Sequence, residues 1–141
     1  MAFERVRFAG FASTKQAVSA SGNTVYEKII NEDGLLRLEE ITVGFDSILQ
    51  ASGYFSLYIN GTLISDRIQP LSSISGYGFS NLHTWIYKGT KIQVIVQNSD
   101  ASNSGYFQVL ASIYEEREVP TALEKLQIAV LEKQLKALGG I

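Results

Sequence analysis

Tyr54-Phe-Ser-Leu-Tyr-Ile-Asn-Gly-Thr-Leu-Ile64 is the stretch that decides the fold. Asn60-Gly61 stands between two alternating runs, and this arrangement is the strongest short-range signal of a β-hairpin. Phe55, Leu57 and Ile59 share one face of the first strand, so we expect that face to be buried. The chain therefore contains antiparallel β-structure with one face toward a core.

The same period-two pattern continues on both sides of this hairpin, between about residues 24 and 114. Turn residues interrupt it at the short intervals typical of a β-sandwich or barrel. Leu36 and Leu38 would face away from Ile41 unless a residue were inserted, so the sequence predicts a bulge near Glu39-Glu40. Strands are expected over residues 24–30, 36–45, 54–59, 62–64, 82–87, 91–97 and 105–114.

A Ser- and Gly-rich stretch over residues 70–81 separates the hairpin from the last three expected strands. We expect it to cross from one sheet to the other, as a Greek key requires. The predicted fold is all-β, an antiparallel jelly-roll-like β-sandwich over residues 1–118, followed by one C-terminal amphipathic helix.

A helix is predicted over residues 121–138. Thr121 and Glu124 form a capping-box signature at its start, and two glycines follow its last turn. The charged run over residues 115–118 is interpreted as a joint between the sandwich and the helix.

The predicted helix has a wide apolar face. At 100° per residue its aliphatic side chains gather on two neighbouring flanks, and its charged side chains occupy the remaining arc. An isolated helix of this length is marginal in water, so this face must be buried against protein. Residues 119–141 are therefore expected to form a docking or oligomerisation segment. The residues assigned to docking are Leu123, Leu126, Val130, Leu131, Leu135 and Leu138.

Composition excludes several classes of function. Hydrophobic residues make up 45% of the 141 residues and charged residues 18%, which is ordinary for one folded domain. The net charge is −2 and no basic cluster is present, so we expect no nucleic-acid partner. There is no cysteine, which excludes disulfides and thiolate metal sites. The N-terminus shows no secretory signal and no membrane span, so we expect no membrane association.

No catalytic motif was recognised, and we expect neither enzyme activity nor a cofactor. The single histidine, His83, is interpreted as an ordinary strand residue. The polar loops over residues 31–33 and 98–103 are candidates for calcium binding, but turn chemistry explains both. The predicted catalytic and metal-binding sites are therefore none.

Aromatic residues are numerous, and some must lie on faces directed away from the core. Exposed aromatic rings can stack on sugars or anchor a protein partner. Cross-strand packing or burial between subunits is the alternative role and the one favoured here. The candidate ligand-stacking residues are Tyr54, Tyr58, Trp85 and Tyr106.

Three stretches resemble the TNF/C1q-like trimeric jelly-roll modules and the similar modules of virion decoration, spike and tail-fibre head proteins. These are Gly53–Thr62, Tyr87–Val94 and Gly105–Val109, and the resemblance covers about residues 11–117. It implies a homotrimer that acts in assembly or recognition without chemistry. The C-terminal helix departs from these modules.

The function expected from the sequence is therefore that of a non-catalytic virion structural protein, a capsid decoration or spike component. Its expected partners are its own copies, as a trimer, and a capsid or other virion protein. The expected location is the virion, with the cytoplasm or the extracellular space as the alternatives. A carbohydrate- or receptor-binding module that uses exposed aromatics is the second hypothesis, and a small glycan-active enzyme ranks third.

Overall fold

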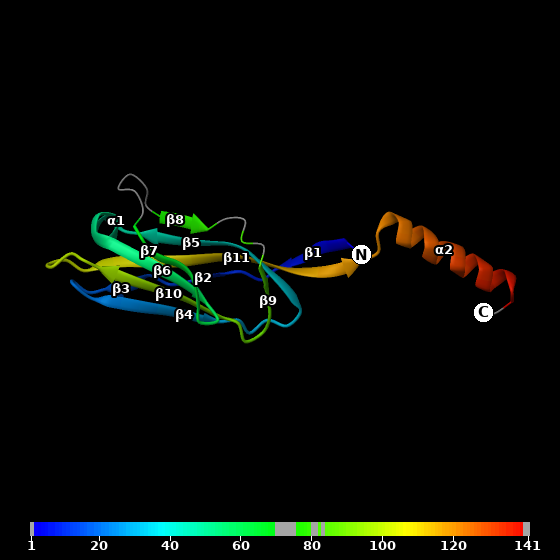
Figure 1. Ribbon diagram of the computed structural model, residues 1–141, viewed down its shortest axis with the longest axis horizontal. Helices are drawn as coiled ribbons and strands as arrows, with labels where there is room; N and C mark the ends of the chain where they lie inside the picture. The colour runs from blue at the N-terminus through cyan, green and yellow to red at the C-terminus, as the bar shows by residue number, and fades with distance from the viewer. Residues whose placement is uncertain (1, 70–75, 80–81, 83, 140–141) are drawn as a thin grey trace.

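A computed structural model describes residues 2–69, 76–79, 82 and 84–139. Two antiparallel sheets pack face to face, and a helix follows at the C-terminal end (Figure 1). The predicted all-β antiparallel sandwich with a C-terminal helix is therefore confirmed.

The first sheet has the strand order β1-β11-β5-β8, with β2 and β3 beside β11 and β9 beside β5. The second sheet has the order β4-β10-β6-β7. The strands are β1 (Ala2–Phe8), β2 (Phe11–Ala12), β3 (Gln16–Val18), β4 (Asn23–Ile29), β5 (Leu35–Phe45), β6 (Gly53–Ile59), β7 (Thr62–Ile68), β8 (Gly76–Phe79), β9 (Thr84–Ile86), β10 (Lys91–Asn98) and β11 (Gly105–Val119). The helices are α1 (Ser47–Ser52) and α2 (Ala122–Ala137).

This strand order is that of a jelly roll. β1, β2 and β3 all pair with β11, and they act as one interrupted first strand. β8 and β9 both pair with β5 and act as one interrupted sixth strand. Counted in this way, the described part of the sandwich has eight strands: the first, third, sixth and eighth form the first sheet, and the second, fourth, fifth and seventh form the second, as in two Greek keys.

The predicted bulge in β5 is confirmed. Ile113 pairs with Leu38 but Ser112 pairs with Glu40, so Glu39 is the extra residue. The insertion turns both halves of the strand toward the core, and Leu38 and Ile41 are both fully buried. Without it, one half of the strand would direct its leucines or its β-branched residues into water.

The central hairpin also forms as predicted. Asn60 and Gly61 have φ values of 49° and 78°, the left-handed conformation that the tight hairpin turn needs. Phe55 and Leu57 are buried as expected. The expected inward faces of β10 and β11 are likewise buried, at Ile92, Val94, Val96, Phe107, Val109, Ala111 and Ile113.

Several features differ from the predictions, among them the strands β1, β2 and β3, which form before residue 24, where no strand was expected. The charged run over residues 115–118 is part of β11, which continues to Val119, so it is no joint. β8 forms within the stretch expected to be a connection, and most of that connection lies outside the described residues. The unpredicted helix α1 begins at Asp46, whose carboxylate caps the Leu49 N–H, and it places Leu49 in the core.

Candidate assembly surface

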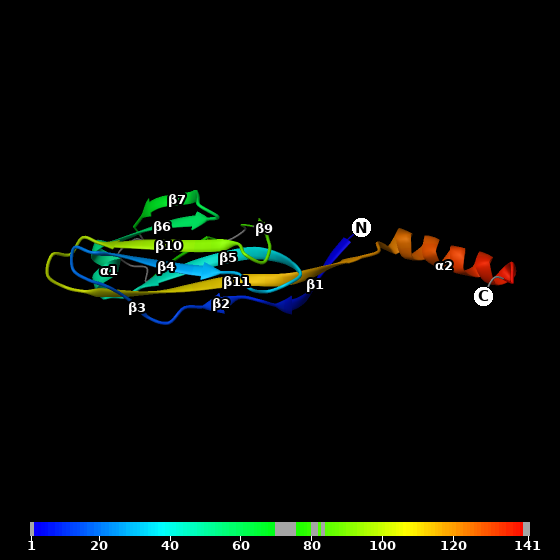
Figure 2. The ribbon, with the colours of Figure 1, turned by 90° about the horizontal axis from the view of Figure 1, so that it is seen from below.

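A two-stranded ribbon extends beyond one end of the sandwich. β5 pairs with β11 only as far as Glu116, whereas β1 follows β11 to its last residue, Val119. Every described side chain of β1 is exposed. The ribbon, the N-terminal end of the chain and α2 therefore lie at the same end of the molecule (Figures 1 and 2).

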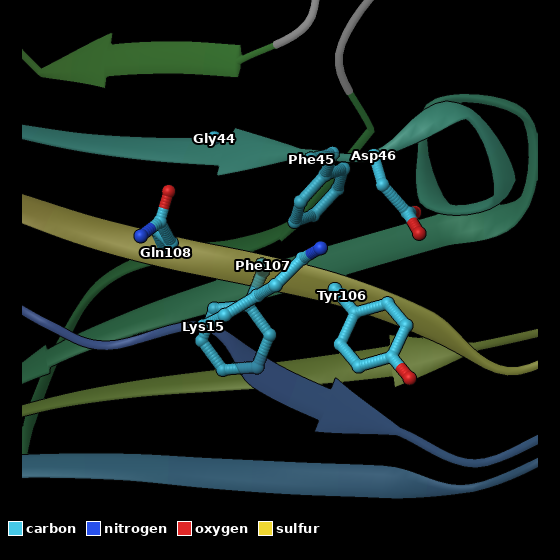
Figure 3. A pocket seen from close by; sticks show the side chains of 7 residues that line it. All are labelled: Lys15, Gly44, Phe45, Asp46, Tyr106, Phe107 and Gln108. Carbon is cyan, nitrogen blue, oxygen red and sulfur yellow. The ribbon is translucent and has the colours of Figure 1, made fainter.

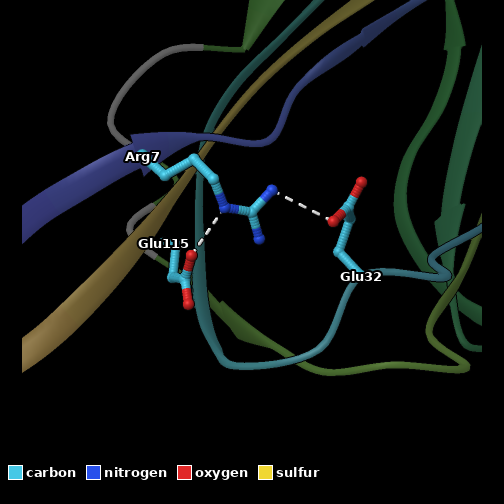
Figure 4. A network of polar contacts seen from close by, with 3 residues as sticks. All are labelled: Arg7, Glu32 and Glu115. Atoms are coloured by element: carbon cyan, nitrogen blue, oxygen red, sulfur yellow. Dashed lines mark hydrogen bonds and ion pairs between the residues drawn. The ribbon is translucent and has the colours of Figure 1, made fainter.

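Ion pairs fix the base of this ribbon. The Arg7 guanidinium donates to Glu115 of β11 at 2.6 Å and to Glu32 of the β4–β5 connection at 3.0 Å (Figure 4). These hydrogen bonds, that to Glu115 first, raise the pKa of Arg7 above its ordinary value. Further out, Arg117 pairs with Glu4 across the two strands. The network joins three segments that are distant in the sequence.

An aromatic row crosses the outer face of the first sheet near the ribbon. Phe8, Tyr114, Arg37 and Trp85 are successive cross-strand neighbours on β1, β11, β5 and β9. The rings of Phe8 and Tyr114 meet edge to face at 5.5 Å, and the Arg37 guanidinium lies 5.1 Å from the Trp85 ring. The Phe3 ring also contacts Trp85, at 5.3 Å. Trp85 is therefore contacted by Phe3 of the ribbon and by Arg37 of β5, and it remains 41% exposed.

Helix α2 begins with the predicted capping box. The Thr121 hydroxyl oxygen accepts a hydrogen bond from the Glu124 N–H, and the same hydroxyl donates to the Glu124 carboxylate, both at 3.2 Å. Gly139 ends the helix with a φ of 68°.

No residue of α2 is buried, and the helix extends away from the sandwich beyond the ribbon (Figure 2). The six predicted docking residues all lie on its exposed surface, and the sandwich covers none of them. Their exposed fractions are 64% for Leu123, 62% for Leu126, 47% for Val130, 58% for Leu131, 47% for Leu135 and 83% for Leu138. Ile128 adds a seventh apolar side chain, at 46%.

The four candidate stacking residues do not form one site. Tyr54 and Tyr58 lie on the outer face of the second sheet, where the Arg67 guanidinium sits 5.5 Å from the Tyr54 ring. Trp85 belongs to the aromatic row and Tyr106 lies on the outer face of the first sheet. Tyr114 is the β11 member of the row that contains Trp85, and Tyr106 lies eight residues from it along β11, or about 26 Å. Tyr106 and Trp85 therefore belong to separate regions of this face.

Of these four, Tyr106 alone adjoins a hollow among those described here (Figure 3). The hollow has a volume of about 250 Å³, and Lys15, Gly44, Asp46 and Gln108 share its lining with Tyr106. Sequence reasoning missed these four residues. The usable signal was Gly44, because a glycine inside a strand often marks close approach of a ligand or another chain.

The remaining features considered from the sequence are the histidine, metal ligands and a membrane span. His83 lies outside the described residues. Within the described ranges, no three or more His, Cys, Asp or Glu residues gather as metal ligands would. In that same part of the chain, no helix has the length and apolar character needed to cross a membrane.

Comparisons with known proteins add little to this description. No protein family and no curated protein matches the chain. A serine protease of Aeromonas sobria superposes with a TM-score of 0.49 and 12% identity, over 82% of this chain and 28% of the protease chain. Dimeric latent PorU from Porphyromonas gingivalis gives 0.36 and 12%, over 79% and 13%.

A Podospora anserina GH26-CBM35 β-(1,4)-mannanase gives a TM-score of 0.38 and 8% identity, over 86% of this chain and 28% of the mannanase. The chain thus spans less than a third of each of these three proteins. None of the three is described as a virion protein, and similarity at this level assigns no function.

Proposed function

We propose that this protein is a non-catalytic assembly protein whose copies associate as a trimer through α2. The observation that supports this most is the uncovered apolar face of α2. Six large aliphatic side chains on the 16-residue helix and a seventh at its C-cap, Leu138, are each 46% exposed or more, and they leave a surface that a single chain does not bury.

The spacing of these side chains favours association with other copies of the same helix. Ile128, Leu131, Leu135 and Leu138 follow the three–four spacing of a coiled-coil seam. Leu123, Leu126 and Val130 form a second flank beside it. Two adjacent flanks allow one helix to pack against two neighbours at once, which favours a trimer over a dimer.

Two glutamines fit the same arrangement. Gln127 and Gln134 are seven residues apart within the apolar arc, and both line a hollow on the helix surface with Leu126, Val130 and Leu131. In a parallel bundle, equivalent glutamines from three chains would meet in two layers. Such polar layers fix the register and the number of chains at some cost in stability.

The magnitude of burial is sufficient for stable association. A large aliphatic side chain that becomes buried contributes roughly 1.5–3 kcal/mol. Partial burial of seven such side chains per chain would help to offset the cost of association and of ordering the helix, which alone is marginal at about 24 Å in length.

Single-cysteine variants test the arrangement, because the natural chain has no cysteine. Under oxidation, Gln134→Cys should form interchain disulfides, since equivalent positions near the axis of a parallel bundle come within bonding distance. Ala129→Cys, on the polar side of α2, is the matched control and should remain uncrosslinked. Equal crosslinking of both variants, or a monomer by light scattering at micromolar concentration, would contradict the proposal.

The biological setting we propose is a virion, with the protein as a capsid decoration or spike component and a capsid or other virion protein as its further partner. The jelly-roll strand order and the absence of a recognised catalytic motif support this setting. The flanking genes test it: capsid, portal or terminase genes would support the virion, and a metabolic operon would contradict it.

A further inference from the structure

Three glycines lie together on the outer face of the first sheet. Gly44 of β5 pairs with Gly76 of β8, and Thr42 pairs with Gly78, so three glycines lie on one face of two adjacent strands. A Cβ atom added at Gly44 would meet no atom of the described residues within 4 Å, and the φ of Gly44 is not positive. Neither backbone conformation nor close packing requires glycine there. What this glycine provides is open space above the sheet.

Gly44 lies where two hollows join into one groove. The hollow beside Tyr106 and a second hollow of about 290 Å³ beside Leu110 share Gly44 and Gln108 in their linings. Tyr106 and Leu110 are four residues apart on β11, so the groove runs for about 13 Å along the strand. A groove of this length fits a short chain of linked rings better than one small molecule.

The walls combine apolar surface with neutral and charged polar groups. The Tyr106 ring and the Leu110 side chain are 40% and 50% exposed. Between them stands the Gln108 amide, which faces away from the core (Figure 3). Thr42 lines the groove on the β5 side and supplies a hydroxyl.

Charge at the Tyr106 end of the groove is balanced. The Lys15 ammonium lies 4.8 Å from the Tyr106 ring and supplies a cationic donor. The Asp46 carboxylate uses Oδ1 to cap α1, and within the described part of the chain its Oδ2 accepts no hydrogen bond. One positive and one negative group at the same end disfavour a strongly charged ligand.

We propose that this groove binds a neutral oligosaccharide. A sugar ring presents an apolar C–H face, which would pack on Tyr106 and Leu110, and a rim of hydroxyl groups, which the Gln108 amide, the Asp46 carboxylate and the Lys15 ammonium would bind. The open space above Gly44 lets the sugar chain lie against the sheet. This inference is independent of α2 and of the trimer.

A glycan array carrying neutral and sialylated oligosaccharides tests the proposal with the full-length chain. Tetramers of β-1,4-linked glucose, mannose and N-acetylglucosamine are then titrated in solution by NMR. We expect at least one neutral oligosaccharide to bind and to shift the amide signals of Gly44 and Gln108.

Two variants locate the binding. Gly44→Val fills the groove without backbone strain, and a β-branched residue suits a strand, so the variant should melt at or above the wild-type temperature. It should nevertheless weaken binding by at least about tenfold, or 1.4 kcal/mol. Tyr106→Ala should do the same by removing the stacking surface. Tyr58→Ala, on the other sheet, is the matched control and should bind as the wild type does.

The outcomes separate clearly. Binding of no neutral oligosaccharide at millimolar concentration would overturn the proposal, as would binding of sialylated glycans alone. It would also be overturned by full binding in both Gly44→Val and Tyr106→Ala. Should Gly44→Val fold poorly, the exposed Tyr106→Ala substitution still decides the question.

Discussion

Asn60 and Lys91 exchange two hydrogen bonds between the hairpin turn and the first residue of β10. The Asn60 N–H donates to the Lys91 carbonyl at 2.8 Å, and the Asn60 side-chain oxygen accepts from the Lys91 N–H at 2.9 Å. Asn60 forms both hydrogen bonds in the left-handed conformation, with a φ of 49°. One residue therefore shapes the β6–β7 turn and also fastens it to the neighbouring strand.

Substitution of Asn60 should separate these two contributions. Asn60→Ala loses both the tolerance of positive φ and the side-chain hydrogen bond, and we expect it to lower the free energy of unfolding by about 1–3 kcal/mol. Asn60→Gly keeps the turn conformation and should cost less. Urea denaturation measures both, and equal losses would show that the hydrogen bond contributes most of the stabilisation.

Leu131→Asp should convert the assembled protein to monomers without unfolding the sandwich. A charge in the apolar face opposes burial between helices, whereas no residue of α2 is buried in its own chain. Deletion of residues 119–141 should have the same effect. Light scattering and circular dichroism report mass and β-structure respectively.

Ala129→Asp is the control for Leu131→Asp, because it places the same charge on the polar side of α2 and should leave the mass unchanged. Unfolding of the truncated sandwich would instead show that the helix stabilises its own subunit.

Phe3→Ala should shift the fluorescence of Trp85, the only tryptophan, to longer wavelength. The Phe3 ring covers part of the indole, and its removal admits water to a side chain that is already 41% exposed. Phe8→Ala is the control, since Phe8 contacts Tyr114 rather than Trp85. Emission spectra and acrylamide quenching provide the measurement. An unchanged spectrum in Phe3→Ala would place the ribbon away from Trp85 in solution.

Asp100 should make stability depend on pH in the acidic range. Hydrogen bonds from the backbone N–H groups of Ser102 and Asn103, both 2.9 Å, lower the pKa of its carboxyl group. A lowered pKa in the folded state gives stabilisation that is complete above the unfolded pKa, about 3.9, and is lost as pH falls through the folded value. Asp100→Asn should therefore be less stable than wild type at pH 6, and the difference should shrink below about pH 4. Denaturation series at several pH values test this, and a constant difference would contradict it.

Calcium and EDTA should leave the melting temperature unchanged. The loop after β10 uses its polar groups internally: Asp100 Oδ1 caps two N–H groups, and the Asn98 amide donates to the Asn103 carbonyl at 2.9 Å. Differential scanning fluorimetry with and without each reagent is sufficient. A rise of several degrees with calcium would show that this loop opens to bind an ion.

The sequence predicted most reliably the strands whose burial alternates. One side of β10 is buried along its whole length, so the alternation of Ile92, Val94 and Val96 with polar residues predicts which face is inward. β1 carries no such signal, because both of its faces are exposed and its pairing with β11 is set by the strand opposite. The extension of β11 through four charged residues was missed because these side chains carry no alternation of apolar and polar residues, although Glu116 is buried in the structure.

The groove could be predicted only in part. Tyr106 was identified as a candidate from its residue type and its position in an alternating strand. Lys15 and Asp46 reach it from distant parts of the chain, through the β3–β11 pairing and the start of α1, and only tertiary structure brings them together. Gly44 was not among the candidate site residues, because a single glycine in a strand does not by itself show whether space lies above it.

The position of β11 also determines how the molecule would resist mechanical force. It is paired on both sides, with β1, β2 and β3 along one edge and β5 along the other, and it runs directly into the segment that leads to α2. Tension applied through the helix would act along this strand, perpendicular to its interstrand hydrogen bonds. The two ladders would then be loaded in shear, with their bonds sharing the force rather than opening one after another. A protein tethered by its C-terminal helix would in this way hold its sandwich intact against drag.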